Sequence, residues 1–253
     1  MDLKSFLEEK ANLYNRPEFI ADDPISIPHQ FSKKEDIEIS GFFSAAIAWG
    51  QRPVILKNAN RLMLMMDNAP HQFILHHSKN DLKPFSKFVH RTFNGIDCIY
   101  FIQALQNIYK KHGGMEKAFN LDLKKTDTDL SNAIHQFRQL FFSIPYPSRT
   151  KKHLADPSAN SSSKRICMFL RWMVRKDKSG VDFGIWNSVQ MNQLACPLDL
   201  HSARVARSLG LLQRTQSDWK AVKELTIKLK EFDPADPVKY DFALFGLGVN
   251  EKF

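Results

Sequence analysis

The chain has 253 residues, 43% hydrophobic and 25% charged, so it can bury a core as one large domain or two lobes. This balance excludes a disordered tail and a fibrous repeat. Lysine and arginine number 36 against 27 for aspartate and glutamate. The formal charge of +9 favours a polyanionic partner, nucleic acid before a membrane surface, although a diffuse charge on a soluble basic protein is the alternative.

Several common classes of protein are excluded by missing patterns. No run approaches 18 apolar residues, and the opening MDLKSFLEEKANLY is amphipathic with no signal segment, so we expect a cytoplasmic location. Cys98, Cys167 and Cys196 are far apart, which argues against a disulfide framework or a cysteine-bound metal. Neither GxGxxG, GxxxxGK[ST] nor HExxH occurs, so we expect no cofactor and no metal.

Helical periodicity runs through most of the chain, and no stretch alternates as a strand does, so the predicted fold class is all-α. Apolar residues at three- and four-residue steps predict helices over 37–49, 53–67, 96–110, 130–141, 162–176, 200–212, 217–231 and 237–247. Between them lie three longer loops rich in proline, serine or glycine, at 15–34, 143–163 and 177–198. No internal repeat is present.

The helix predicted over 162–176 is apolar around almost its whole circumference, which is typical of a buried central helix. Lys164 lies in its first turn, just after a serine run suited to N-capping. The positive end of the helix dipole and any burial both favour an uncharged amine there. An uncharged lysine amine is a nucleophile that can form a Schiff base. The alternative is a solvated lysine at a helix start.

Asp199 stands just before the helix predicted over 200–212. Aspartate is a good N-cap, so capping alone explains its presence as well as chemistry does. Arg204 and Arg207 lie on faces of that helix where phosphate contact and plain solvation are both open.

Other basic and aromatic residues are candidates for contact with nucleic acid. Arg149, Lys151, Lys152 and His153 lie in the 143–163 loop, where we expect phosphate contacts. The segment FVHRTF, residues 88–93, is either a loop near a pocket or DNA, or the site of a buried arginine that satisfies local carbonyls. Three tryptophans either stack on bases or belong to the core: Trp49, Trp172 and Trp186.

The segment PLDLHSARVARSLGLL, residues 197–212, resembles the VDxHVxRVxxRLGL segment of the helix-hairpin-helix DNA glycosylase superfamily. The resemblance implies that Asp199 is the catalytic carboxylate. It also implies that Lys164 is the catalytic lysine, although DPSANSSSK lacks the glycines of the superfamily's LPGVGxKTA hairpin. The implied fold is a two-lobed helical bundle with an atypical hairpin, forming one catalytic unit over residues 1–253.

The archaeal 8-oxoguanine glycosylases are the branch of that superfamily most similar to this chain. The resemblance implies a base pocket made by Gln51, Met168, Asp241 and Phe245, with Met and Phe where the branch has an aromatic residue and a tryptophan. Over nearly its full length the chain is also identified as a member of the DUF2400 family, through segments such as HQFSKKEDIEISGFFSAAIAWGQR and DPVKYDFALFGLG.

The implied function is excision of a flipped, damaged purine such as 8-oxoguanine from double-stranded DNA, with abasic-site lyase activity through a Lys164 Schiff base. The protein is expected to act as a monomer at the bacterial nucleoid. The expected DNA contacts are Arg149, Lys151, Lys152, Ser163, His201 and Arg204. Two alternatives stay open: a non-catalytic DNA-binding or lesion-sensing module on the same fold, and a helical scaffold or small-molecule enzyme unrelated to DNA.

Overall fold

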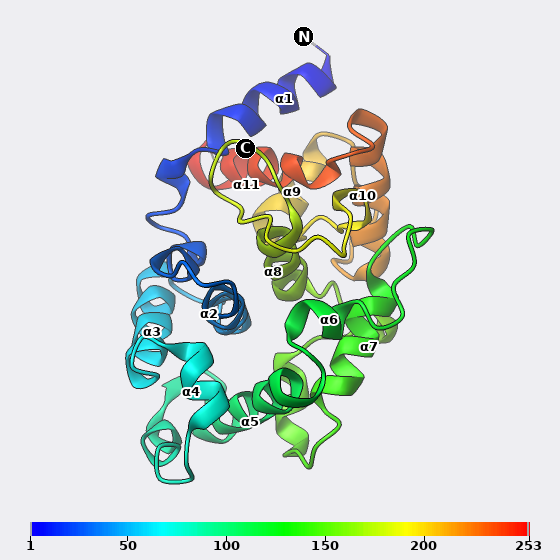
Figure 1. Ribbon diagram of the computed structural model, residues 1–253. Coiled ribbons are helices and arrows are strands. Elements are labelled where there is room, and N and C mark those ends of the chain that lie inside the picture. Colours follow the sequence, from blue (N-terminus) through cyan, green and yellow to red (C-terminus); the bar gives the residue numbers. More distant parts are fainter. Residues whose placement is uncertain (1, 252) are drawn as a thin grey trace. The chain divides into compact units, whose positions relative to one another are not determined.

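A computed structural model of the protein describes residues 2–251 and 253, and its regular structure is almost entirely helical (Figure 1). The all-α prediction is therefore confirmed. The α-helices are α1 (Leu3–Tyr14), α2 (Lys34–Ala46), α3 (Arg52–Met65), α4 (Pro70–His76), α5 (Gly95–Lys111), α6 (Met115–Phe119), α7 (Ser131–Phe141), α8 (Lys164–Val174), α9 (Leu200–Ser208), α10 (Trp219–Phe232) and α11 (Tyr240–Asn250).

Short 3₁₀ helices occupy much of the three predicted loops. They are η1 (Pro17–Phe19), η2 (Pro24–Ser26), η3 (Pro28–Gln30), η4 (Lys83–Lys87), η5 (Ser148–His153), η6 (Pro157–Ala159), η7 (Met191–Gln193) and η8 (Pro237–Lys239). Five of these eight begin at proline, whose fixed φ suits a first helical position.

The prediction that no strand exists is wrong at one place in the described chain. β1 (Val89–His90) and β2 (Phe93–Asn94) form an antiparallel hairpin. Strands of two residues are too short for alternation of apolar and polar residues to reveal them. Periodicity also does not predict α4 and α6, because seven and five residues span two turns at most.

The chain divides into two compact units, each built from separated segments. Unit 1 comprises residues 1–21, 123–132 and 156–253, and unit 2 comprises residues 22–122 and 133–155. In unit 1, α11 packs against both α1 and α9 (Figure 1). Two glycines permit this close approach, since a Cβ at Gly246 would lie 2.1 Å from the Tyr14 ring and one at Gly248 2.9 Å from the His201 Cβ.

Phenylalanine rings fill the core of unit 2. Phe42 of α2 lies 5.7 Å from Phe101 of α5 and 5.8 Å from Phe137 of α7, measured between ring centroids. Phe93 of the hairpin meets Phe101 edge to face at 5.2 Å. All four side chains are buried, so the hairpin is fixed to the same core as the three long helices.

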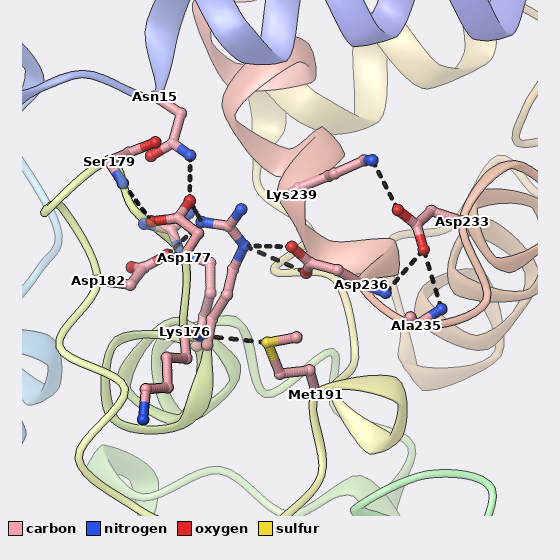
Figure 2. A network of polar contacts seen from close by, with 12 residues as sticks. Asn15, Lys176, Asp177, Ser179, Asp182, Met191, Asp233, Ala235, Asp236 and Lys239 are labelled. Atoms are coloured by element: carbon pink, nitrogen blue, oxygen red, sulfur yellow. Dashed lines mark hydrogen bonds and ion pairs between the residues drawn. The ribbon is translucent and has the colours of Figure 1, made fainter.

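Unit 1 contains a buried ionic network at the end of α8. The Arg175 side chain donates to Asp236 Oδ2 at 3.0 Å, to Asp182 Oδ2 at 3.1 Å, and to Asp177 Oδ2 at 2.8 Å. Figure 2 shows these three carboxylates together, with Asn15 of α1 donating to Asp177. Because buried charges must be paired, the network fixes the 177–198 loop to α1 and α8.

Asp182 is the most buried carboxylate in this network. Its side chain has no exposed surface and also accepts from Arg171 at 3.2 Å. We expect Asp182→Asn to lower the free energy of unfolding by about 3–5 kcal/mol. The substitution removes a negative charge that the buried guanidinium groups of Arg171 and Arg175 share. Glu231→Gln removes an exposed pair with Lys228 and serves as the control, with a change of about 1 kcal/mol or less. Equal denaturant midpoints for the two variants would contradict the network's structural role.

Candidate active site: a lysine and a carboxylate at two helix starts

The two residues predicted to carry chemistry lie together, although 35 positions separate them in sequence. Lys164 is the first residue of α8 and Asp199 is the N-cap of α9. Lys164 Nζ lies 3.4 Å from Asp199 Oδ2, and the two side chains are 34% and 10% exposed. The contact is longer than an ideal charge-assisted hydrogen bond, as catalytic contacts often are before substrate binds. The lysine is therefore partly accessible, while its carboxylate partner is nearly buried.

The backbone around each residue explains this geometry. Ser163 precedes α8 in the left-handed conformation, with φ of 48° and ψ of 29°, and its side chain makes no capping bond. A serine therefore occupies the N-cap position as predicted, but its side chain does not cap the helix and instead donates to the Ser161 carbonyl at 3.3 Å. Asp199 does cap its helix, since its Oδ1 accepts from the Ser202 amide at 2.7 Å. One carboxylate oxygen thus holds α9 while the other faces the lysine.

Asp241 of α11 lies behind this pair. The Ser202 hydroxyl contacts Asp241 Oδ1 at 3.5 Å, and the Arg171 guanidinium donates to Asp241 Oδ2. Asp241 is only 6% exposed. Both of its carboxylate oxygens therefore have partners within the chain, and the role of this residue in reading a base stays a prediction.

Burial raises the pKa of Asp241 to about 6, an effect opposed by Arg171 and reinforced by the negative charge of Asp199. An unfolded aspartate titrates near pKa ~3.9, so the folded chain holds this proton more tightly than the unfolded chain does. The resulting stabilisation is fully present below about pH 4 and is lost as the pH rises through about 6.

Urea unfolding of the wild-type chain and of Asp241→Asn between pH 4 and pH 7 measures this effect. We expect the stability of the wild type, relative to the non-titrating variant, to fall by about 2–3 kcal/mol as the pH rises through this range. A difference that does not change with pH would show that Asp241 keeps an ordinary pKa in the folded chain.

The other predicted pocket residues are distributed over both units. Met168 lies one turn after Lys164 on α8 and is half-buried. Phe245 of α11 is half-buried, with its ring 6.1 Å from that of Phe19 and 6.4 Å from that of His201. Gln51 is exposed at the N-cap of α3, in unit 2. Met168 and Phe245 thus belong to the unit that holds Lys164, and the role of Gln51 stays a prediction.

The predicted DNA contacts in unit 1 differ in the exposure of their side chains and in the hydrogen bonds that these already make. Arg204 is exposed, but it donates to the Gly248 carbonyl at 2.8 Å. Ser163 is buried. His201 is half-buried, and its Nδ1 has no hydrogen-bond partner among the described residues. Arg207 donates to the carbonyls of the segment 214–215.

The predicted DNA contacts in unit 2 lie on η5. Arg149 donates to the Thr92 carbonyl at 2.9 Å. The Lys151 ammonium lies 4.9 Å from the centre of the Tyr146 ring, and Lys152 is exposed. These cations lie at the surface, as a phosphate contact requires.

Burial decides the alternatives for two of the tryptophans, because Trp172 and Trp186 are core residues with exposures of 0% and 2%. Trp49 is half-buried and stacked on His153 at 5.9 Å, and its stacking on a base stays a prediction. In FVHRTF, Phe88, His90 and Phe93 are buried and Arg91 is exposed, so the buried-arginine alternative is wrong. A place of this segment near a pocket or DNA stays a prediction.

Sequence reasoning did not single out Ser202, Arg171 or Asp182, which connect the pair to the interior of unit 1. A signal for the arginines does exist, because Arg171 and Arg175 interrupt a helix that is otherwise apolar on every side. A buried cation requires carboxylate partners, although the pattern does not say which carboxylates these are.

Within residues 2–251 and 253, no group of three or more His, Cys, Asp or Glu side chains is placed to hold a metal ion. The three cysteines are buried and unbonded. Over the same residues, no helix is long and apolar enough to cross a membrane.

The protein is therefore helical, and the lysine at the start of α8 contacts the carboxylate that caps α9. Residues 23–250 match the family described as "Protein of unknown function (DUF2400)". Because the match covers most of its length, the chain belongs to this family. No curated protein and no solved structure matches the chain.

Proposed function

We propose that the protein is a DNA base-excision glycosylase of the helix-hairpin-helix type, with abasic-site lyase activity. The observation that supports this most is the 3.4 Å contact between Lys164 Nζ and Asp199 Oδ2. A nucleophile beside a carboxylate that can accept its proton is the arrangement that covalent excision of a base requires.

In the proposed reaction, the uncharged Lys164 amine attacks C1′ of the damaged nucleotide. The bond from C1′ to the base breaks, and its electron pair leaves with the base, which takes up a proton. The attacking nitrogen then loses a proton to Asp199. The bond from C1′ to O4′ breaks, O4′ takes that proton from Asp199 to become a hydroxyl, and a protonated Schiff base between Lys164 and C1′ results. Loss of a proton from C2′ expels the 3′-phosphate and cleaves the strand, after which water hydrolyses the Schiff base.

Asp199 has two roles in this proposal. Its carboxylate accepts the proton of the attacking amine, and its negative charge stabilises the positive charge that develops on the sugar. The Ser202 amide holds Asp199 at 2.7 Å, so the carboxylate is oriented before substrate arrives. Preorganisation of this kind lowers the cost of reaching the transition state.

For the substrate, we propose a flipped purine lesion such as 8-oxoguanine in double-stranded DNA. Met168, one turn from Lys164 on α8, offers a polarisable thioether for contact with a base. Phe245 and Asp241 of α11, in the same unit, complete the part of the proposed pocket that lies in unit 1. The formal charge of +9 favours a polyanionic partner, and the protein is proposed to act as a monomer at the bacterial nucleoid.

A panel of duplex oligonucleotides, each with one lesion at a known position, tests the proposal. The panel includes 8-oxoguanine, alkylated purines, oxidised pyrimidines and uracil, and the free base is measured after incubation with the full chain. We expect release to be fastest for an oxidised purine. Tight binding without base release across the whole panel would instead support a non-catalytic, lesion-sensing module.

A further inference from the structure

We propose that unit 2 carries its own binding surface for nucleic-acid phosphates, centred on Arg91. The surface consists of residues 49–52, 89–92 and 148–153, which we call the arginine corner. The inference rests on the proposed function in taking DNA as the partner. It extends that proposal to a site in the unit that does not contain Lys164.

Contacts within unit 2 join the three segments of the arginine corner. His90 Nε2 lies 3.2 Å from the Trp49 carbonyl oxygen, which connects the hairpin to the start of α3. Arg149 Nη2 donates to the Thr92 carbonyl at 2.9 Å, which connects η5 to the hairpin. The corner is therefore one continuous surface, although its segments are far apart in sequence.

Arg91 occupies a backbone conformation that arginine rarely adopts. Its φ is 53°, in the left-handed region. Arg91 is the first of the two residues that join β1 to β2, a position where tight hairpin turns require a positive φ, so the hairpin itself fixes where this arginine stands. The side chain lies over Gly50, where an added Cβ would stand 3.0 Å from Arg91 Nη1. Gly50 itself has a φ of 109°, a conformation that favours glycine, and because glycine has no Cβ there is room for the Arg91 side chain above it.

The charge of Arg91 is not neutralised within the protein. The side chain is exposed and makes no ion pair with a carboxylate of the described residues. The three segments of the corner contain five lysine and arginine residues and no aspartate or glutamate: Arg52, Arg91, Arg149, Lys151 and Lys152. Such a concentration of one charge attracts polyanions.

The buried carboxylate of Asp97 holds the segments of the arginine corner together. Asp97 of α5 has no exposed surface, and it accepts from Thr150 Oγ1 at 2.8 Å and from the Asn94 amide at 3.0 Å. His153 Nε2 and Arg149 Nη2 lie 3.2 Å and 3.3 Å from Asp97 Oδ2, the oxygen that also accepts from the Asn94 amide. Because these contacts hold η5 and the hairpin on one helix start, the cations are arranged before a ligand binds.

A phosphodiester chain is the polyanion that fits this surface best. Duplex DNA carries one charge per ~1.7 Å of its axis, so several fixed cations can meet phosphates at once. The planar guanidinium of arginine also matches the geometry of phosphate oxygens. Trp49 is half-buried, and its ring contacts those of His90 and His153, so it does not stand free as an apolar anchor for a protein partner.

The test measures binding of the full chain to an undamaged duplex over a range of salt concentrations. Each phosphate contact contributes about 0.9 to the slope of log affinity against log salt. We expect Arg91→Gly to lower this slope by about 1 and to weaken binding roughly 10-fold at 0.1 M salt. Glycine tolerates the left-handed backbone, so this variant keeps the fold while removing the cation. A second variant, Lys152→Ala, removes an exposed cation without a backbone change, and we expect a similar loss.

Lys111→Ala is the charge-matched control, because Lys111 ends α5 at the opposite end from Asp97. We expect it to leave slope and affinity unchanged. If Arg91→Gly and Lys152→Ala bind as Lys111→Ala does, or if the chain binds an acidic peptide but not DNA, the arginine corner is refuted. Because the duplex is undamaged and no base is released from it, the salt slopes report on the corner alone, and absence of base release from lesion DNA would concern only the proposed reaction.

Discussion

Replacing Lys164 by glutamine is expected to eliminate the covalent adduct that borohydride traps between wild-type protein and lesion DNA. Glutamine is one atom shorter than lysine and uncharged, and its amide cannot form a Schiff base. We expect base release to fall by about 10⁴-fold or more, on the scale seen when an enzyme loses its nucleophile. The measurement is a gel assay for the trapped adduct, with free base quantified in parallel.

The chain offers a matched control for this variant. Lys223 forms a pair with Asp129 at the same distance as Lys164 with Asp199, 3.4 Å, in the same unit. Lys223→Gln removes an equal charge and an equivalent pair, yet we expect it to keep full trapping and base release. Stability should change little for either variant, because partly exposed pairs contribute about 1 kcal/mol or less. A Lys164→Gln protein that still gives the trapped adduct would contradict the assignment of the nucleophile.

Replacing Asp199 by asparagine is expected to separate its role in capping α9 from its role in the reaction. Asparagine caps a helix about as well as aspartate, so Asp199→Asn should unfold at nearly the wild-type midpoint. The same variant lacks the negative charge that accepts the proton and stabilises the sugar cation. We therefore expect base release to fall by about 10²–10⁴-fold. Thermal unfolding and single-turnover base release measure the two quantities.

Asp199→Ala extends the comparison, since alanine removes the cap as well and should cost about 1 kcal/mol of stability. Asp218→Asn is the control for capping, because Asp218 caps α10 through the Ala221 amide at 3.1 Å. It should keep full activity. If Asp199→Asn releases base at the wild-type rate, the carboxylate serves only to cap α9, and the proposed mechanism fails.

The all-α class and the positions of most long helices could be predicted from periodicity alone, although α1 (Leu3–Tyr14) is not among the predicted helices. Apolar steps of three and four residues identify α5, α7 and α10 to within about two residues at most ends. The α9 prediction extends four residues too far, because α9 ends at Ser208 and Gly210 turns the chain with φ of 72°. A glycine inside an apolar pattern marks this end only when its backbone conformation is known.

The proximity of Lys164 and Asp199 was predictable through the resemblance of residues 197–212 to a known segment, but not from periodicity. The partners behind them were not predictable. Whether Asp241 faces a ligand or Arg171 depends on how α11 packs against α1 and α9, where Gly246 and Gly248 allow a close approach. Likewise, the left-handed Arg91 could not be predicted, because its conformation belongs to the two-residue turn of a hairpin that periodicity does not reveal.

Mass mapping of the borohydride-reduced adduct tests the central claim most directly. The full wild-type chain is incubated with an 8-oxoguanine duplex and borohydride, and the trapped complex is digested with nuclease and protease. We predict that the sugar remnant is attached to Lys164 alone, with no modification of Lys223. Attachment to another lysine, or the absence of any adduct under conditions in which the lesion base is released, would contradict the account.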